Sequence, residues 1–340
     1  MSYPSPTVTV VVPSRGRTAL LERALLSVGA QTVRPLEVVV VADGTTIPHP
    51  PPAGDVPVRV VELATSVGGA EARNVGVREA RGELIAFLDD DDAWVPTKLE
   101  KQLALREATG ARVLASRVIA ELPGHHQVWP RRLLGPGQDV GDYLLVRRSP
   151  LRGETLIQTS CLLVDRDLLL EVPFTTGLPR HQESDWLIRA VHRTGVVPVI
   201  HPEPLTYWDC TPRRDRISTG RRWEQSLLWV DGLRPLISPH AYASFLLTGV
   251  ATIARDASDY RGLLDLLRLS RLRGRPQRQD LLVWASIVLS PPADGRLKQL
   301  VKRALVADRS GTADDAVVSV AAGRGPASPH PLADPAALAG

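Results

Sequence analysis

Four adjacent carboxylates are the first side chains in this sequence whose type and spacing could do chemistry. Asp89–Asp92 directly follow the apolar segment Leu84–Leu88, which is typical of a buried strand. Open α/β sheets bind ligands at the carboxyl ends of their strands, and unpaired carboxylates repel one another, so we expect a divalent cation there. Hard oxygen ligands suit Mg²⁺ or Mn²⁺. The alternative is a solvated acidic turn before the next helix, and the run alone leaves both interpretations open.

Two further polar segments precede the acidic run. Ser66–Asn74 holds two adjacent glycines ahead of a predicted helix, so its backbone can approach a ligand closely, and Arg73 could pair with a phosphate. Asp43 follows the predicted strand Glu37–Ala42 and could accept hydrogen bonds from a base or a ribose. Each segment has an ordinary alternative, because strand-to-helix loops often carry a surface arginine and aspartate is common in turns.

The first 120 residues must position these groups, and they alternate β-branched apolar runs with helical patterns. Runs of Val and Ile that are apolar on both faces predict an α/β, Rossmann-like fold with a mostly parallel sheet flanked by helices. Thr18 is the expected N-cap of the first helix. The predicted strands are Val8–Val12, Glu37–Ala42, Val58–Leu63, Leu84–Leu88 and Arg112–Ala120, and the predicted helices are Thr18–Val28, Gly69–Ala80 and Pro96–Ala108.

The rest of the chain divides into shorter elements and a helical region. We expect a helix near Asp139–Val146, a strand at Leu156–Val164 and a helix at Glu183–His192. Residues 222–305 are mostly helical in pattern, and residues 310–340 lack periodicity, which predicts a disordered tail. The predicted domains are residues 1–220, with a nucleotide half at about 7–120 and an acceptor half at about 121–220, then a helical region at 221–309 and the tail at 310–340.

Composition and charge narrow the classes of protein. The chain has 340 residues, of which 44% are hydrophobic and 23% charged, as in ordinary globular proteins. Its net charge of +4 includes only four lysines, and residues 211–278 carry thirteen arginines against six acids. This pattern indicates phosphate on a ligand, or only codon preference, and not nucleic acid, which requires denser positive charge. Cys161 and Cys210 form no metal or disulfide motif, and no apolar stretch approaches the roughly 20 residues of a membrane span, so we expect a cytoplasmic protein.

Five short motifs follow one another along the first 92 residues. They are Val10–Arg17, Leu26–Gln31, Glu37–Thr45, Gly68–Asn74 and Gly82–Asp92. In this order and spacing they closely resemble family 2 of the glycosyltransferases, inverting enzymes with the GT-A nucleotide-diphospho-sugar fold. The resemblance covers about residues 7–210 and implies a GT-A domain with a mainly helical extension. Ser66 is one departure, since the family usually has Asn there.

The resemblance implies a donor site built from the strand ends. Pro13, Ser14 and Arg15 would line the nucleotide pocket. Asp43 would hydrogen-bond the base, and Arg73 would face the nucleotide. In the acidic run, Asp89 and Asp91 would form the family's DxD motif, the first near the ribose and the second on a Mg²⁺ or Mn²⁺ that bridges the donor diphosphate. Within that run, the nucleotide-sugar side would be formed by Asp89 and Asp90, and the metal side by Asp91 and Asp92, with Asp92 sharing the ion or standing behind it.

An inverting transfer also needs a general base, because the acceptor loses its proton as it attacks the anomeric carbon in a single displacement. The segment Leu178–Arg189 resembles the family's acceptor-side motif, so Glu183 is the expected base and Asp185 the reserve. The alternative is a pair of acids that the helix dipole favours at a helix start. His181 precedes that helix and is expected to be a loop residue and not a base.

Two arginine-rich segments carry further expectations. Arg213, Arg214 and Arg216 stand where relatives often carry a mobile loop over the diphosphate, and their guanidinium groups would stabilise the departing charge. A solvated loop is the alternative. Residues 261–275 mix Leu with Arg. That mixture predicts either peripheral contact with an anionic membrane, at its inner face, or a helix packed on the protein with its arginines outward.

The expected function is transfer of a sugar from a nucleotide-sugar donor, UDP- or dTDP-linked, to an acceptor that the sequence does not identify. Members of the family build cell-wall and other polysaccharides and act on glycan, lipid-linked, natural-product and peptide acceptors. A sugar-phosphate nucleotidylyltransferase is disfavoured, because Pro13–Arg17 lacks a second glycine pair and no lysine precedes Lys98. The remaining alternative is a catalytically inactive GT-A module that binds a nucleotide or a glycan.

Overall fold

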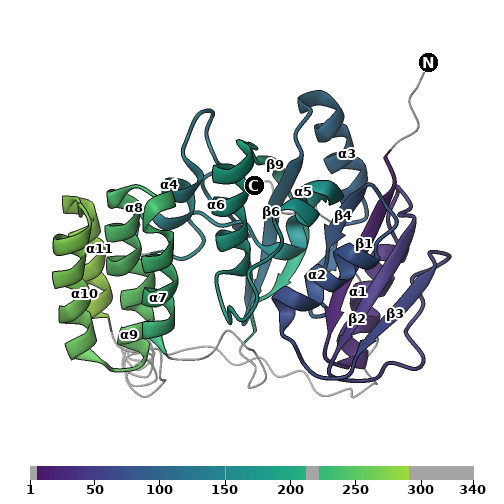
Figure 1. Cartoon of the computed structure of the whole chain (residues 1–340), viewed down its shortest axis with the longest axis horizontal. Helices are drawn as coiled ribbons and strands as arrows, with labels where there is room; N and C mark the ends of the chain where they lie inside the picture. The colour runs from purple at the N-terminus through teal and green to yellow at the C-terminus, as the bar shows by residue number, and fades with distance from the viewer. Residues whose placement is uncertain (1–5, 150, 212–221, 291–340) are drawn as a thin grey trace, which may run out of the picture. The chain divides into compact units, whose positions relative to one another are not determined.

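Valine-rich runs form four neighbouring strands in the computed structural model, which describes residues 6–149, 151–211 and 222–290 (Figure 1). They are β1 (Val8–Ser14), β2 (Glu37–Asp43), β3 (Val58–Leu63) and β4 (Leu84–Phe87). Val10 lies opposite Val38 of β2 and Ala86 of β4, and all four strands run parallel in the order β3-β2-β1-β4. β2 is buried along its whole length, as a strand covered on both faces must be.

The other half of the sheet contains antiparallel pairs. Its strands are β5 (Ala93–Trp94), β6 (Val113–Leu122), β7 (His125–Trp129), β8 (Leu163–Asp165) and β9 (Val199–Asp209). β8 runs antiparallel to both β4 and β6, whereas β6 and β9 are parallel. β7 and β5 pair antiparallel with β6 and β9. The predicted α/β fold is confirmed, and its parallel arrangement holds for the nucleotide half, but the complete sheet is mixed.

Helices cover both faces of the sheet because successive residues of a strand point to opposite sides. Val10 and Val12 of β1 belong to the apolar core that α1 and α3 complete. Val11 belongs to the core on the other face, which α2, α5 and α6 complete. The covering helices are α1 (Thr18–Gly29), α2 (Gly69–Glu79), α3 (Lys98–Thr109), α5 (Arg166–Glu171) and α6 (Gln182–Thr194).

Two local predictions about element boundaries are wrong. Thr18 is the first residue of α1 and not its N-cap; Arg17 takes the cap position and directs its side chain to the acidic run. The expected strand Leu156–Val164 is mostly a 3₁₀ turn, η1 (Thr159–Cys161), followed by the short β8. The reason is local, because the side chain of Gln158 accepts a backbone hydrogen bond and caps that turn.

Residues 223–289 form the predicted helical region, which packs on the second half of the sheet domain. Leu145 and Val146, at the end of α4 (Val140–Leu145), share one apolar cluster with Ile188 of α6 and the carboxyl-terminal helices. α8, η4 and α9 follow one another without a break. The helices are α7 (Trp223–Leu233), η3 (Arg234–Leu236), α8 (Pro239–Phe245), η4 (Leu246–Val250), α9 (Ala251–Asp256), α10 (Tyr260–Arg273) and α11 (Arg278–Leu289).

The described residues all fall within one compact unit. The predicted tail at 310–340 lies outside the described residues, as does the predicted helical pattern beyond 290. The domain division near residue 220 stays a prediction. Within the described part of the chain, none of the helices has both the length and the apolar character needed to cross a membrane.

Close packing of α2 on β1 predicts the effect of one glycine substitution. A Cβ added at Gly76 of α2 would lie 2.3 Å from Cγ1 of Val11, a stiff side chain in a buried strand. Gly76→Ala should therefore lower the free energy of unfolding by about 1–3 kcal/mol, as overpacking does. Gly232→Ala is the control, because nothing lies within 4 Å of that position in α7 and alanine favours the helix. Urea unfolding measures both, and an unchanged midpoint for Gly76→Ala would contradict this packing.

Candidate active site

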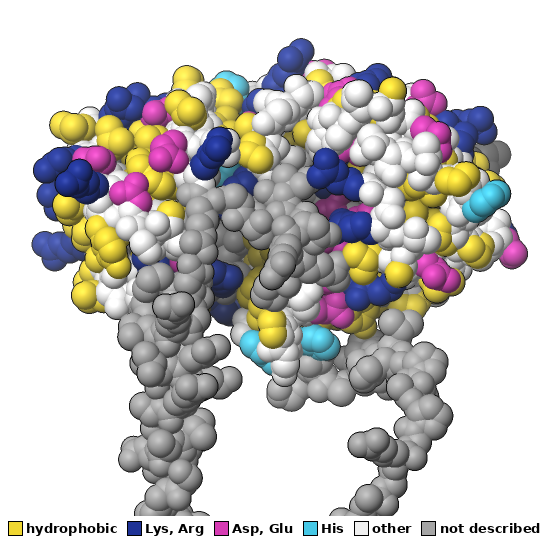
Figure 2. Space-filling model, turned by 90° about the horizontal axis from the view of Figure 1, so that it is seen from below, with side chains coloured by type: hydrophobic (Ala, Val, Ile, Leu, Met, Phe, Trp, Pro, Cys, Tyr) yellow, Lys and Arg dark blue, Asp and Glu magenta, His cyan; other side chains and the backbone are white. Residues whose placement is uncertain are grey.

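The parallel strands bring the polar residues at the starts of three loops to one edge of the sheet. Ser14 and Asp43 end β1 and β2, and Asp89–Asp92 follow β4, which pairs with β1. Because the carboxyl ends of parallel strands meet at the same edge, these groups lie together despite their separation in the chain. Figure 2 shows the molecule from below, the side toward which β1 runs in Figure 1, with acidic side chains among basic ones.

Asp90 is enclosed by donors from the first strand and helix. Its side chain is only 2% exposed; it accepts a hydrogen bond from Oγ of Ser14 (2.7 Å) and forms an ion pair with the guanidinium of Arg17. The same guanidinium reaches Oδ2 of Asp91 with Nη1 (3.3 Å). Asp91 is more open, with 15% of its side chain exposed. The first loop therefore neutralises the middle of the acidic run and leaves part of Asp91 accessible.

Arg73 joins the acidic run to the helix that carries the expected base. This side chain of α2 is nearly buried; it forms an ion pair with Asp89 and donates from Nη1 to Oε1 of Gln182 on α6 (2.7 Å). Its Nε is buried without a hydrogen-bond partner among the described residues. Asp89 keeps a quarter of its side chain exposed. Three segments far apart in the sequence therefore meet around one guanidinium group.

Asp92 lies behind the edge, where protein donors occupy both its oxygens. Oδ2 accepts from Nε2 of Gln158 (2.8 Å) and Oγ of Ser160 (2.6 Å), and Oδ1 accepts from the backbone N–H of Asp209 (3.1 Å). Burial raises the pKa of Asp92 well above its usual range, with the charges of Asp89 and Asp91 adding to the effect. The contacts of Asp92 are those of a group that holds the acidic loop in place.

Asp43 and Ser66 join the ends of β2 and β3. The buried Asp43 carboxylate accepts hydrogen bonds from the backbone N–H groups of Val67 (2.5 Å) and Gly68 (3.2 Å) and from Oγ of Ser66 (2.9 Å). The same Ser66 hydroxyl accepts from Nη2 of Arg15 (2.8 Å). Ser66, a departure from the family pattern, thus connects the first loop to Asp43. Pro13, one residue before the end of β1, pairs with β2 and is half-buried.

Glu183 follows Gln182, the residue of α6 that Arg73 joins to the acidic run. It is half-buried near the start of the helix, close enough to Arg73 and Asp89 for both charges to act on it. Burial raises the pKa of Glu183 most, the Arg73 charge lowers it in part, and the Asp89 charge raises it further. A carboxylate whose pKa is raised in this way can accept a proton nearer to neutral pH.

Asp185 faces a different part of the protein. Two residues along a helix correspond to about 200° of rotation, which turns Asp185 away from Glu183. Its carboxylate is buried; it accepts from Nε1 of Trp229 on α7 (3.0 Å) and from Oγ1 of Thr175 (2.7 Å), and it pairs with Arg189 (2.7 Å). These contacts join α6 to the helical region and leave Asp185 no free edge toward the acidic run.

His181 is a packing residue at the start of α6. Its ring stacks on Trp229 with centroids 4.3 Å apart, and its Nε2 lies 2.9 Å from Oγ of Ser226. Burial, with help from the Arg180 charge, lowers the pKa of His181 to about 4, so the ring is neutral at physiological pH. The expectation of a loop residue fits these contacts.

The sequence interpretation missed several residues that support this site. Gln158 and Ser160 hold Asp92, and Oγ of Ser160 also accepts the backbone N–H of Asp89 (2.9 Å). Their signal was a polar triplet, residues 158–160, inside a run taken for an apolar strand. Arg17 lies in the first of the five motifs, but the sequence did not predict its contacts with the acidic run. The three arginines of the expected diphosphate lid, Arg213, Arg214 and Arg216, lie outside the described residues.

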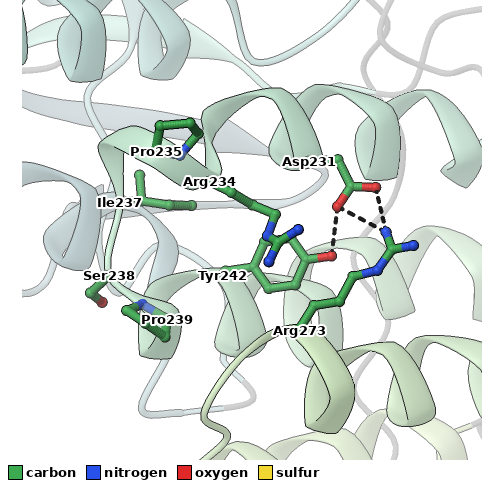
Figure 3. Close-up of a pocket in the computed structure, with 8 residues that line it drawn as sticks. All are labelled: Asp231, Arg234, Pro235, Ile237, Ser238, Pro239, Tyr242 and Arg273. Atoms are coloured by element: carbon green, nitrogen blue, oxygen red, sulfur yellow. Dashed lines mark hydrogen bonds and ion pairs between the residues drawn. The ribbon is translucent and has the colours of Figure 1, made fainter.

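A pocket of about 420 Å³ lies elsewhere, in the helical region (Figure 3). Asp231 of α7 accepts a hydrogen bond from the hydroxyl of Tyr242 (2.7 Å) and pairs with Arg273 of α10 (3.1 Å). The guanidinium of Arg234 lies over the Tyr242 ring. None of the residues that line this pocket belongs to the strand-end edge, so it is separate from the candidate active site.

Comparisons with known proteins agree with this geometry. A family model described as "Glycosyl transferase family 2" matches residues 9–172. The amylovoran biosynthesis glycosyltransferase AmsB of Erwinia amylovora is 25% identical over 290 residues, which cover 81% of this chain and 93% of that protein. An uncharacterized glycosyltransferase of Haemophilus influenzae is 26% identical over 309 residues, 87% of this chain and 100% of that protein.

Solved structures show the same fold. The crystal structure of S. aureus TarS 1–349 in complex with UDP-GlcNAc has a TM-score of 0.59 at 16% identity, covering 83% of this chain and 90% of that chain. The sheet and its covering helices have the GT-A fold. Residues 9–172 match the glycosyl transferase family 2 model, the family that the five motifs resemble, and the two long relatives are glycosyltransferases.

A buried lysine beneath the site predicts how stability depends on pH. Lys98 is fully buried; its Nζ donates to Gln102 (2.7 Å) and lies 4.1 Å from the ring centroid of Trp94. Burial lowers its pKa to about 7. The unfolded chain, with a lysine pKa of about 10.4, binds more protons between these two values, so the free energy of unfolding should rise with pH across that window.

Lys98→Met should remove this rise and stabilise the protein near pH 7, because it removes the cost of burying an ammonium group. Urea unfolding at several pH values between about 6.5 and 10 measures both effects. Lys101→Met is the control, since Lys101 begins the next turn of α3 at the surface and pairs with Glu203. If the free energy of unfolding of Lys98→Met rose with pH as in the wild type, Lys98 would not be the group responsible for this rise.

Proposed function

We propose that this protein transfers a sugar from a UDP- or dTDP-sugar to an acceptor hydroxyl, with inversion at the anomeric carbon. The observation that carries this proposal is the contact of Arg73 with both Asp89 and Gln182, which brings the start of α6, where Glu183 lies, to the acidic run. A nucleotide-sugar needs a guanidinium group for its phosphates and a carboxylate beside it. An attacking hydroxyl needs a carboxylate with a raised pKa to accept its proton.

The donor nucleotide would lie across the ends of β1 and β2. Arg15, half exposed beside Asp43, is available to a phosphate or a base. The unpartnered Nε of Arg73 is a buried donor that a ligand oxygen would satisfy. In this arrangement Ser14 and Asp43 act through the loops they hold, since their side chains are engaged with Asp90 and with residues 66–68.

A Mg²⁺ or Mn²⁺ ion fits the donor set beside the diphosphate. Asp91 and Asp89 offer hard oxygen atoms and are the exposed members of the acidic run, whereas Asp90 and Asp92 are enclosed. No group of three His, Cys, Asp or Glu side chains in the described ranges could hold a metal alone. That agrees with an ion held by one or two carboxylates together with substrate phosphates. When bound, the ion would neutralise charge on the leaving diphosphate.

Glu183 would act as the general base of a single displacement. As the acceptor oxygen attacks the anomeric carbon, its proton passes to the Glu183 carboxylate. The bond from the anomeric carbon to the diphosphate oxygen breaks in the same step, and the nucleoside diphosphate departs with that electron pair. Asp185 is engaged by Trp229, Thr175 and Arg189 and would position α6.

The names of relatives point to the biological class of product. Besides AmsB, relatives that match about a third of the chain are named succinoglycan biosynthesis protein ExoO of Rhizobium meliloti and putative teichuronic acid biosynthesis glycosyltransferase TuaG of Bacillus subtilis. These names support a role in assembling a cell-wall or other polysaccharide, a reaction that we place on the cytoplasmic side of the membrane. The acceptor would then be a growing glycan, free or lipid-linked.

Asp91→Asn should abolish most metal-dependent turnover, because it removes the accessible carboxylate charge beside the diphosphate. We expect nucleotide release from a panel of UDP-, dTDP- and GDP-sugars with Mn²⁺ to fall by about 10²–10³-fold. Calorimetry should show that Mn²⁺ no longer strengthens UDP binding. Asp55→Asn, at a side chain 92% exposed, is the matched control. Release and binding like the wild type would reject Asp91 as a metal ligand, and no release from any donor by the wild type would reject the transfer itself.

Glu183→Gln should separate chemistry from donor binding. We expect kcat to fall by about 10²–10⁴-fold while the donor Kd stays nearly constant. The wild-type rate should fall as the pH drops through the raised pKa of Glu183, because the protonated carboxyl cannot accept the acceptor's proton. Glu171→Gln, at an exposed position of α5, is the control. Full turnover by Glu183→Gln would show that another group is the base.

A further inference from the structure

Exposed apolar side chains are concentrated in the last two described helices. Leu289, Leu272 and Leu282 are 84%, 80% and 72% exposed, more than any other large hydrophobic residue in the described part of the chain. Tyr260 and Leu264 add 57% and 52% on α10. Single exposed leucines are ordinary on protein surfaces, but this clustering within two neighbouring helices is not.

α10 has two apolar faces, only one of which is buried. Leu263, Leu266 and Ser270 are buried where α10 packs on α8, η4 and α9. At 100° per residue, an arc of about 120° on the other side holds a second set of side chains, all exposed. We call this set the α10 outer face; it consists of Tyr260, Arg261, Leu264, Arg268, Arg271 and Leu272.

The charge of this segment is strongly positive. Residues 260–278 hold six arginines and one aspartate, Asp265, which pairs loosely with Arg268 (3.4 Å). Asp259 stands near Arg261 but is engaged as the N-cap of α10. Arg273 turns to the opposite side, where it pairs with Asp231. Figure 2 shows basic and hydrophobic side chains, with some acidic ones among them, at the end of the molecule that carries α10 and α11.

We propose that the α10 outer face binds the surface of a membrane rich in anionic phospholipid. Leucine and tyrosine side chains would enter the boundary between headgroups and acyl chains, and the arginines between them would pair with lipid phosphates. α10 has 14 residues, about 21 Å of helix, so it lies on the surface and does not span it. This interaction goes beyond the proposed transfer reaction and does not depend on it.

Charge favours a membrane over a second copy of the chain. A symmetric dimer through this face would set the same patch against itself, arginines opposite arginines, without the acids needed to neutralise them. An anionic lipid surface supplies those charges. The sequence posed two alternatives for residues 261–275, and the structure combines them, since α10 packs on the protein with its arginines outward and also exposes leucines among them.

Vesicle sedimentation of the full chain tests the proposal. The probes are phosphatidylcholine vesicles with and without about 30 mol % phosphatidylglycerol, at low and high salt. We expect binding to the anionic vesicles alone and its loss at high salt, because screening weakens attraction between exposed charges. No binding to anionic vesicles, or equal binding to neutral ones, would overturn the proposal.

Two double variants separate the contributions of the apolar and the basic side chains to vesicle binding. Leu264→Gln/Leu272→Gln and Arg268→Gln/Arg271→Gln should each weaken partitioning by about tenfold or more, with thermal unfolding and nucleotide release in solution unchanged. Leu151→Gln/Leu170→Gln, at exposed leucines elsewhere, is the control. Leucine variants that bind like this control would overturn the proposal. The proposal would also be overturned if light scattering showed that the wild-type protein is a dimer and the leucine variant a monomer. The α10 outer face would then be an interface between two copies of the chain.

Discussion

Mutual repulsion among four neighbouring carboxylates is the constraint on which the site depends. Each enclosed or paired member of the run is compensated from a different segment. Asp89 meets Arg73 of α2, Asp90 meets Ser14 and Arg17 of the first loop, and Asp92 meets Gln158 and Ser160 of η1. The loop after β4 is therefore stable only when the strands and helices around it have assembled. Its geometry is a product of the whole sheet domain.

Enclosure alternates along the run, and this alternation gives the site its chemistry. Asp90 and Asp92 are nearly inaccessible, whereas Asp89 and Asp91 keep 25% and 15% of their side chains exposed. A ligand can therefore reach the first and third carboxylates, the two that the DxD resemblance assigned to donor and metal. The second and fourth carboxylates fix the loop from behind. The same composition in a solvated turn would leave all four equivalent to a ligand.

Arginine suits this compensation better than lysine because its planar guanidinium makes several directed contacts and stays charged when buried. Arg17 contacts two carboxylates, and Arg73 joins a carboxylate to an amide on another helix. Lys98, fully buried beneath the site, shows the contrast, since burial lowers its pKa to about 7. Part of the unusual arginine content is thus structural, and on α10 it forms a separate basic and apolar surface.

Local patterns were sufficient for the elements and the family. Valine runs predicted β1, β2 and β3, helical spacing predicted α2 and α6 to within two residues, and the ordered motifs predicted the family whose model matches residues 9–172. Where a side chain competes with the backbone, as at Gln158, the local pattern misled, and an expected strand became a turn. Such competition depends on a single hydrogen bond that periodicity does not record.

The sequence by itself determined that carboxylates follow β4 and that acids begin α6. Only the tertiary structure decided which of them a ligand can reach. Arg73 joins Asp89 to Gln182, the residue before Glu183, while Asp185 is turned toward Trp229 and Asp92 toward η1. The physical reason is that exposure and pairing depend on the rotational position of a helix and on partners some 70 residues or more away, such as Ser14 for Asp90 and Gln182 for Arg73. Neither is encoded in the local order of residue types.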